Sequence, residues 1–179
     1  ITGSATEMLM GEVRFLRAYA YFTLYRYYGG VPLVTEPTGP KPAYVPRATR
    51  QEMFKFLYDE MAYALDKCLD NRSGIAYGRV TKGAVAGMLA KMKIFHASYI
   101  RRAEMYGDKI NETTAGDVDK TTLYADAVKL CDDIIAGIYG TYELEEYFPA
   151  VFTKRNNEIM FSVLAEEGVG TGNKIPMGF

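Results

Sequence analysis

Apolar side chains are densest between positions 12 and 33, where their spacing predicts one long helix. Residues three and four positions apart lie on one face of a helix, and here they form two neighbouring apolar stripes. The first stripe contains Leu9, Val13, Leu16, Ala20, Leu24 and Tyr27, and the second contains Met8, Phe15, Tyr19 and Phe22. Because a helix that is apolar on nearly every side buries all its faces, we expect it to lie between other layers of the protein.

The ends of this helix are marked by residues that favour helix termination. Ser4 and Glu7 fit a capping box, with Ser4 as the cap. Gly29 and Gly30 supply a left-handed stop, and Pro32 prevents the helix from resuming. We therefore expect the helix to begin after Ser4 and to end near Gly29.

Two arginines interrupt the apolar surface of this helix. Arg14 and Arg17 need carboxylate or carbonyl partners if they are buried with their neighbours. Glu12 is a possible partner, although its spacing from both arginines places it on a different face. The sequence therefore predicts a carboxylate or carbonyl partner for each buried arginine at this helix, without deciding which residue supplies it.

The pattern predicts three more helices, over 49–69, 81–102 and 122–136, with the second and third helices of the chain antiparallel. Glycine costs about 1 kcal/mol in a helix interior, so Gly83 and Gly87 predict that another helix crosses closely there. The proline-rich stretch 36–47 predicts an extended connector, and the polar stretch 105–122 predicts a long exposed loop. Residues 158–163 predict a strand or a buried extended segment, and their length favours the strand.

Composition limits the classes of function. The chain has 179 residues and a formal net charge of −1, which argues against a basic nucleic-acid-binding face. It contains 15 tyrosines and no tryptophan. Cys68 and Cys131 fall on apolar helical stripes, so we expect both to be buried, and the sequence does not decide whether they form a disulfide.

Residues for catalysis do not form a recognisable constellation in this sequence. The one histidine, His96, is expected to be a packing or surface residue. Asp117 and Asp119 in the predicted loop, and the acidic cluster over 143–146, supply fewer oxygen ligands than a calcium loop requires. We therefore expect no catalytic residue, no metal and no cofactor.

Five segments, in order along the chain, carry a family resemblance. They lie at 12–18 with 21–22 and 28–33, at Arg47 and the helix after it that ends near 64–65, at 78–84 with the alanine-rich helix that follows, at 125–135 with 139–152, and at 157–162. Together they resemble the SusD/RagB family, the nutrient-binding lipoproteins of the Bacteroidetes outer membrane. The resemblance implies a mostly α fold of tetratricopeptide-like helix pairs in a right-handed scaffold, with irregular loops. It also implies that residues 1–179 are one piece of a larger domain, with the N-terminal anchor and a C-terminal part outside it.

The same resemblance implies a function at the cell surface. Family members bind oligosaccharides, or in some cases peptides, without catalysis, and they cap a TonB-dependent transporter, the SusC-like barrel. They are anchored through a lipidated N-terminal cysteine, which is neither Cys68 nor Cys131. A helical-repeat scaffold for protein interactions is the alternative from a different class, and an enzyme with its active site elsewhere is the third.

The matching segments are scaffold, so candidate ligand contacts come from physical reasoning instead. Sugar rings stack on exposed aromatic faces, and polar side chains bind their hydroxyl groups. The best candidates in the predicted loops are Tyr44 with Arg47, and Tyr106. The alternative for each tyrosine is that it packs down on the helices.

Overall fold

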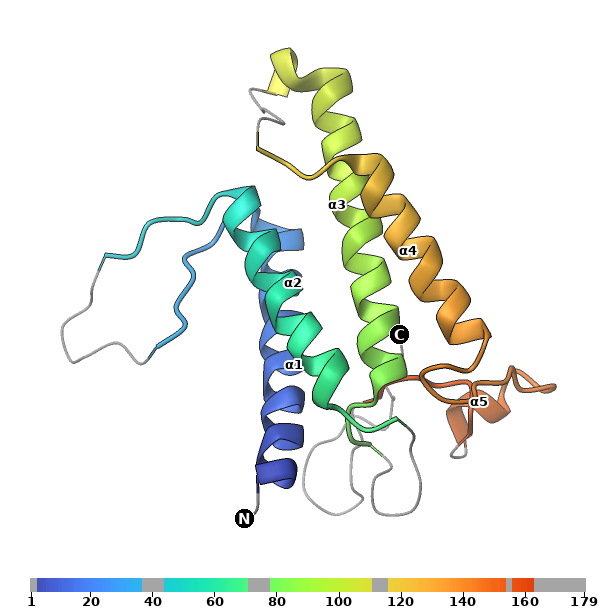
Figure 1. Cartoon of the computed structure of the whole chain (residues 1–179). Coiled ribbons are helices and arrows are strands. Elements are labelled where there is room, and N and C mark those ends of the chain that lie inside the picture. Colours follow the sequence, from blue (N-terminus) through green and yellow to red (C-terminus); the bar gives the residue numbers. More distant parts are fainter. Residues whose placement is uncertain (1–2, 37–43, 71–77, 111–115, 154–155, 163–179) are drawn as a thin grey trace.

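The computed structural model describes residues 3–36, 44–70, 78–110, 116–153 and 156–162, and these ranges contain four long helices and one short helix. The helices are α1 (Gly3–Tyr28), α2 (Arg50–Lys67), α3 (Lys82–Ile110), α4 (Lys120–Ile135) and α5 (Ala150–Thr153). Consecutive long helices run in opposite directions (Figure 1). The fold is therefore mostly α and consists of tetratricopeptide-like helix pairs, as predicted.

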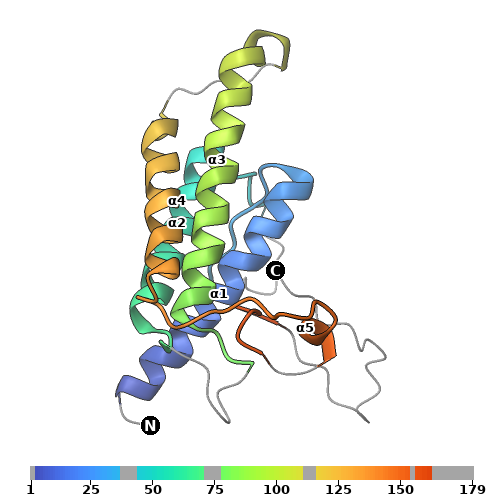
Figure 2. The same cartoon turned by 90° about the vertical axis from the view of Figure 1, so that its right-hand side faces the viewer.

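The helices pack as two antiparallel pairs, α1 with α2 and α3 with α4, joined mainly by contacts between α2 and α3. Figure 2, viewed along the direction of stacking, shows the α3–α4 pair in front of the α1–α2 pair. α1 touches α3 only slightly and α4 packs on α3 alone among the helices. α1 and α4 are therefore the two outer helices of this stack.

Local end signals set most of the helix boundaries. The Thr49 side chain accepts a hydrogen bond from the backbone of Glu52, and the Glu52 carboxylate accepts one from the Thr49 backbone at 2.8 Å, so α2 begins with a complete capping box. Asp119 caps α4, with its side chain accepting a hydrogen bond from the backbone of Thr122. The predicted cap at Ser4 is wrong, because α1 already includes Gly3 and Ser4 lies within the helix.

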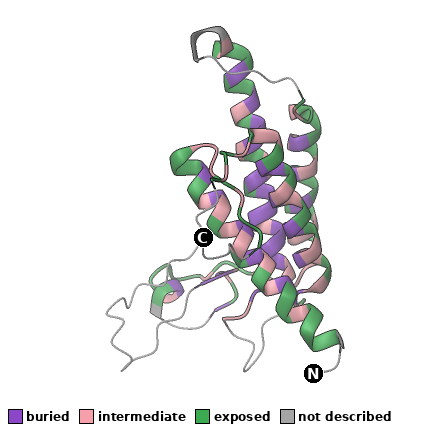
Figure 3. Cartoon of the chain, turned by 90° about the vertical axis from the view of Figure 1, so that its left-hand side faces the viewer, coloured by how far each residue is buried: buried purple, intermediate pink, exposed green. Residues whose placement is uncertain are grey.

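The core lies between the helices and uses the second stripe of α1. Phe15 and Phe22 of that stripe are buried, with Phe54 and Leu57 of α2 and Met92 of α3. Figure 3 shows the buried residues on the facing sides of the helices and the exposed residues on the outer sides. These large side chains belong to one buried cluster that includes residues of all four long helices and so holds the two pairs together.

The first stripe of α1 is exposed, which corrects the prediction that every face of this helix is buried. Exposed fractions run from 42% at Leu9 to 77% at Tyr27. The reason is the position of α1 at the outside of the stack, where α2 and, slightly, α3 cover only one side of it. An apolar helix face predicts that the face is buried, but it does not predict that the segment burying it lies within these 179 residues.

A second exposed apolar stripe follows the outer side of α4 and continues past its end. It contains Val128, Cys131, Ile135 and Ile138. Cys68 is buried as predicted, and burial raises the pKa of its thiol to about 12, but Cys131 is exposed and that prediction is wrong. Both cysteines are free thiols. Both outer helices of the stack thus present apolar rows to their surroundings.

Arg14 and Arg17 do find a carboxylate, as predicted, and it comes from the neighbouring helix. Arg17 donates to Glu60 on α2 at 2.7 Å, and Arg14 lies 3.7 Å from the other oxygen of that carboxylate. Glu12 binds Arg79 at 2.8 Å instead. Glu60 is buried, so the two arginines provide the charge that lets a carboxylate lie between α1 and α2.

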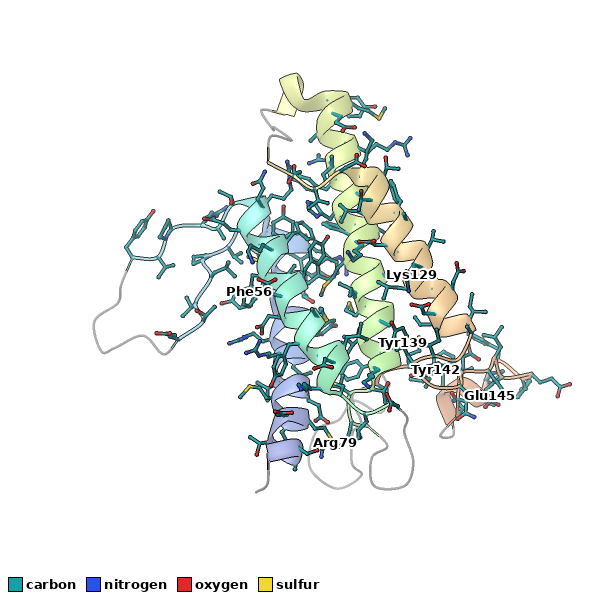
Figure 4. All side chains as sticks on the ribbon, in the orientation of Figure 1. Phe56, Arg79, Lys129, Tyr139, Tyr142 and Glu145 are labelled. Atoms are coloured by element: carbon teal, nitrogen blue, oxygen red, sulfur yellow. The ribbon has the colours of Figure 1, made fainter. Side chains whose placement is uncertain are left out.

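The small residues at the start of α3 receive side chains from the C-terminal segment. A Cβ atom at Gly83 would lie 2.0 Å from the hydroxyl oxygen of Tyr142, and one at Gly87 would lie 3.3 Å from Met160. The Tyr142 hydroxyl also lies 3.1 Å from that of Thr81. Figure 4 shows Tyr142 reaching the foot of α3 from the segment that follows α4. The close approach was predicted correctly, but no helix makes it.

The irregular regions differ from their predictions in two places. α3 continues to Ile110, so the first third of the predicted loop over 105–122 is helix. No strand occurs in the described residues: 156–162 follow a bent path held by Asn156, which accepts from the backbone of Glu158 and Ile159. Ile159 and Phe161 are buried, which agrees with the burial predicted for this segment, but its path is bent instead of extended.

The proline-rich connector is described in part. A backbone bridge joins Pro32 to Arg47, but residues 37–43 lie outside the described ranges, as do Val163 and the glycine-rich stretch after it. Within the described ranges, none of the helices combines the length and the apolar character needed to cross a lipid bilayer.

Candidate functional site

The structure does not bring the three predicted ligand-binding residues together. Tyr44 is 94% exposed and Arg47 is exposed, and both lie in the connector before α2. Tyr106 is 47% exposed and lies on α3, not in a loop. Figure 1 shows the connector beside the α1–α2 pair and the end of α3 projecting past the other helices. Tyr44 and Arg47 can contribute to one surface, whereas Tyr106 belongs to another.

A hollow of about 340 Å³ lies between the first turns of α2, the middle of α3 and residues 116–118; we call it the α2–α3 hollow. Its lining consists of Gln51, Phe54, Lys55, Tyr58, Asp59, His96, Gly116, Asp117 and Val118. Five of these residues, from Gln51 to Asp59, belong to α2 and recur at helical spacings of three and four. One face of α2 therefore forms one wall of the hollow. The site is thus built from three segments that are distant in sequence.

A buried polar chain runs along the inner wall of this hollow. The Tyr58 hydroxyl lies 2.9 Å from Nδ1 of His96, and the imidazole is stacked on Phe54 with its centroid 3.8 Å from the phenyl centroid. Nε2 of His96 lies 3.5 Å from Oδ1 of Asp117. The prediction that His96 is a packing residue is confirmed, since it is 2% exposed. It packs with polar neighbours as well as with Phe54.

Asp117 is fixed by Arg50, the first residue of α2. Nε of Arg50 lies 3.2 and 3.1 Å from the two carboxylate oxygens, and a terminal guanidinium nitrogen also binds the carboxylate. The side chains are 9% and 2% exposed. Burial works to lower the pKa of Arg50, but the hydrogen bond and charge of Asp117 outweigh it and leave the pKa raised. This pair attaches the segment before α4 to the start of α2.

Burial sets the protonation states along the polar chain. It lowers the pKa of His96 to about 4, because the charges of Arg50 and Lys93 add to desolvation and outweigh the attraction of Asp117. Burial also raises the pKa of Tyr58 well above its usual range. Near pH 7 the phenol is therefore protonated and the imidazole is neutral. Since Nε2 faces a carboxylate, we assign its proton to Nε2 and let Nδ1 accept from Tyr58.

This protonation state predicts a loss of stability in acid. His96 takes up a proton near pH 6.5 when the chain is unfolded, but only near pH 4 when it is folded. Stability is then complete above about pH 6.5 and falls as the pH drops toward 4, by about 2 to 3 kcal/mol in the free energy of unfolding. Urea unfolding of the full-length protein at several pH values measures this change.

His96→Gln is the matched control for this prediction, because glutamine keeps a donor near Nε2 but does not titrate. Other carboxylates protonate over the same pH range in both proteins, so the difference between the two profiles isolates His96. If the free energy of unfolding fell with pH equally in the wild type and in His96→Gln, the result would contradict the lowered pKa of His96.

Asp117 and Asp119, two of the acidic residues considered from the sequence, have other partners in the structure. Asp117 binds Arg50 and Asp119 caps α4. Within the described ranges, no three side chains of His, Cys, Asp or Glu lie close enough together to hold a metal ion.

Comparison with known proteins identifies the family of this chain. A family model described as "Starch-binding associating with outer membrane" matches residues 2–94, which is more than half of the chain. The chain belongs to the SusD-like family. The match covers α1, α2 and the first part of α3, so it includes the α2 wall of the hollow and His96 lies just beyond it.

Relatives of this SusD-like chain are much longer than 179 residues. A SusD-like protein of Bacteroides ovatus is 27% identical over 173 residues, which are 96% of this chain and 28% of that protein. The crystal structure of a SusD-like protein from Bacteroides fragilis has a TM-score of 0.69 at 26% identity and covers 92% of this chain and 28% of its own. The chain therefore spans about 28% of the length of these relatives.

Two further structures share the fold at lower identity. A crystal structure with xylogluco-oligosaccharide has a TM-score of 0.72 at 20% identity, over 91% of this chain and 30% of its own. A laminarin-binding SusD-like protein has a TM-score of 0.71 at 20% identity, over 91% and 32%. These likenesses confirm the helical architecture of the SusD-like chain.

The hollow was missed by sequence reasoning, although one signal for it was present. On α2, Tyr58 follows the core residue Phe54 by four positions and has the polar residues Gln51, Lys55 and Asp59 beside it, so one edge of the apolar stripe is polar. The sequence pattern did not reveal the opposite wall of the hollow, because Asp117 belongs to a segment that was predicted to be an exposed loop.

Proposed function

We propose that this chain is the helical scaffold of a non-catalytic protein that binds oligosaccharides at the cell surface and delivers them to a SusC-like TonB-dependent transporter. The observation that carries the proposal is the match of residues 2–94 to a family described as starch-binding and associated with the outer membrane. Fold neighbours with xylogluco-oligosaccharide and with laminarin support a glycan as the ligand class. Anchoring through a lipidated cysteine outside these 179 residues is part of the proposal.

The direct test is binding of the full-length protein to immobilised oligosaccharides. We expect retention by at least one glycan from a panel of α- and β-linked glucans, xylans and sialylated chains, and no release of shorter sugars from it. Retention of peptides alone would favour the peptide-binding alternative. Hydrolysis of any glycan by the purified protein would contradict the non-catalytic function.

The transporter is tested by purification from outer membranes under mild detergent. Recovery of a large β-barrel transporter in stoichiometric amount supports delivery across the membrane. Recovery of a soluble partner in its place would favour the protein-interaction scaffold.

Tyr44 with Arg47, and Tyr106, remain the proposed ligand contacts of this chain. Tyr44 is the better of the two tyrosines because nearly all of its surface is accessible. Stacking on one aromatic face contributes about 0.5–1.5 kcal/mol beyond its area, so Tyr44→Ala should weaken oligosaccharide binding several-fold. Tyr147→Ala, at an exposed tyrosine of the C-terminal segment, is the matched control.

We also propose that residues 1–179 are one piece of a larger helical domain whose other parts cover the exposed stripes of α1 and α4. The length of the relatives and the two apolar rows on the outer helices support this proposal. In a Cys131→Ser background of the full-length protein, a thiol introduced by Leu16→Cys should react with a maleimide far more slowly than one introduced by Asp66→Cys. Equal rates would contradict the proposal.

A further inference from the structure

We propose that Arg14 binds an aspartate or glutamate side chain of the segment that covers the exposed stripe of α1, and that this segment belongs to the same protein outside residues 1–179. The inference rests on the proposal that other parts of a larger domain cover this stripe. It adds the chemistry by which the covering segment is recognised, namely an apolar row with a carboxylate at the edge that faces Arg14.

The first argument is that the Arg14 side chain makes no hydrogen bond to any described residue. One terminal nitrogen lies 3.7 Å from the Glu60 carboxylate, which is beyond a hydrogen bond, and Cζ lies 4.0 Å from the centroid of the Tyr63 ring. Nε is buried without a partner, but the two terminal nitrogens keep contact with solvent and the side chain is 34% exposed. An acceptor from outside the described residues can therefore reach the terminal nitrogens.

The second argument is a surplus of positive charge between α1 and α2. Glu60 is held by Arg17, whose Nε and one terminal nitrogen both lie 2.7 Å from the same carboxylate oxygen. Glu7 and Glu12, the other acidic residues of α1, are paired with basic residues elsewhere. Among the described residues, Arg14 is therefore left without a counter-ion of its own.

The third argument is the position of Arg14 at the edge of the exposed stripe. It follows Met10 by four positions and Val13 by one, and these two side chains are 44% and 57% exposed. A segment that packs on the stripe removes water from the terminal nitrogens of Arg14. Since an unpaired charge is costly to remove from water, we expect the covering segment to supply the opposite charge.

The geometry of Arg14 suits a carboxylate from the rest of the same protein. Tyr63 lies against the guanidinium and restrains it, so its terminal N–H groups are oriented before an acceptor arrives. A planar guanidinium matches the two oxygens of a carboxylate. The chain spans about 28% of the length of its relatives, so the same protein is the nearest source of such a segment.

Arg14→Met in the full-length protein tests whether this acceptor exists. Without an acceptor, the substitution removes a surplus charge that makes no hydrogen bond, so the urea midpoint of unfolding should stay the same or rise. With a covering carboxylate, the substitution leaves that carboxylate buried and unpaired, and the midpoint should fall by roughly 0.5 M. An unchanged or raised midpoint would overturn the proposal.

Two controls separate this acceptor from other causes of a loss. Arg26→Met removes an exposed arginine of the same helix, which lies over the Phe22 ring at 5.8 Å, and should change the midpoint little. In a Glu60→Gln background, which lacks the internal carboxylate, Arg14→Met should still lower the midpoint. An equal fall in Arg26→Met, or no fall in the Glu60→Gln background, would contradict an acceptor specific to Arg14.

Zero-length cross-linking identifies the acceptor. A water-soluble carbodiimide couples the amine introduced by Arg14→Lys to a neighbouring carboxylate, and mass spectrometry of the digested full-length protein locates the bond. We expect a cross-link to an aspartate or glutamate of the same chain outside residues 1–179. A cross-link to Glu60 alone, a cross-link to a different protein, or no cross-link would overturn the proposal.

The maleimide experiment on Leu16→Cys separates this inference from the proposal on which it rests. Slow labelling of that thiol, with no fall of the midpoint in Arg14→Met, would support the covering segment and overturn its carboxylate alone. Fast labelling, with no cross-link from Arg14→Lys, would contradict both. Retention of oligosaccharides, measured on the same variants, tests the proposed function independently of either result.

Discussion

Asp117→Ala is expected to lower the free energy of unfolding by about 3–5 kcal/mol, because it leaves the Arg50 guanidinium buried without the carboxylate that neutralises it. The two side chains are 9% and 2% exposed, so water reaches neither charge well. Arg50 also lies over the ring of Tyr99, 5.1 Å from its centroid, and this contact replaces only part of the lost interaction. Urea unfolding of the full-length protein, followed by circular dichroism, measures the change.

An exposed ion pair on the same helix is the natural control. Lys55 and Asp59 are 75% and 65% exposed and four residues apart, so Asp59→Ala should cost no more than about 0.5 kcal/mol. Arg50→Met combined with Asp117→Leu should recover much of the loss, because a buried pair replaced by apolar side chains leaves no charge unpaired. A loss below 1 kcal/mol in Asp117→Ala, or no recovery in the double variant, would show that this pair is solvated.

The helices were predictable because their signals are local. The capping box at Thr49, the cap at Thr81 and the left-handed Gly137 act within four residues of the boundaries they set. Ser4 fails because a residue suited to capping can also lie inside a helix when the chain before it continues the helical path. α3 extends beyond its predicted end because residues 103–107 mix polar and apolar side chains that are mostly exposed, and such a pattern does not distinguish an exposed helix from a loop.

What covers each surface was not predictable, because it depends on contacts between distant segments. The stripes of α1 look alike in the sequence, yet Phe15 is buried and Leu16 is about half exposed. Gly83 indicated a close neighbour correctly, but the residue that fills the space is Tyr142, some sixty positions later. The α2–α3 hollow was not predictable for the same reason, since Asp117 contacts Arg50 and His96 across long distances in the sequence.

Phe15→Ala is expected to cost about 3–5 kcal/mol of the free energy of unfolding, the range for removing a fully buried phenyl ring. Phe15 is 0% exposed and packs edge-on against Phe161, with 5.2 Å between the ring centroids. The substitution therefore loses a contact that joins α1 to the C-terminal segment as well as the core contacts between the helices. Thermal and urea unfolding of the full-length protein should both report it.

Tyr28→Ala at the end of the same helix removes a comparable ring from a position that is 66% exposed. It should change the free energy of unfolding by no more than about 0.5 kcal/mol, because the ring is already largely exposed to solvent in the folded protein and its removal loses few contacts. The contrast tests the orientation of α1 directly, since the sequence places both rings on one strongly apolar helix and only the fold distinguishes them. Equal losses would mean that the buried face of α1 has been assigned to the wrong side.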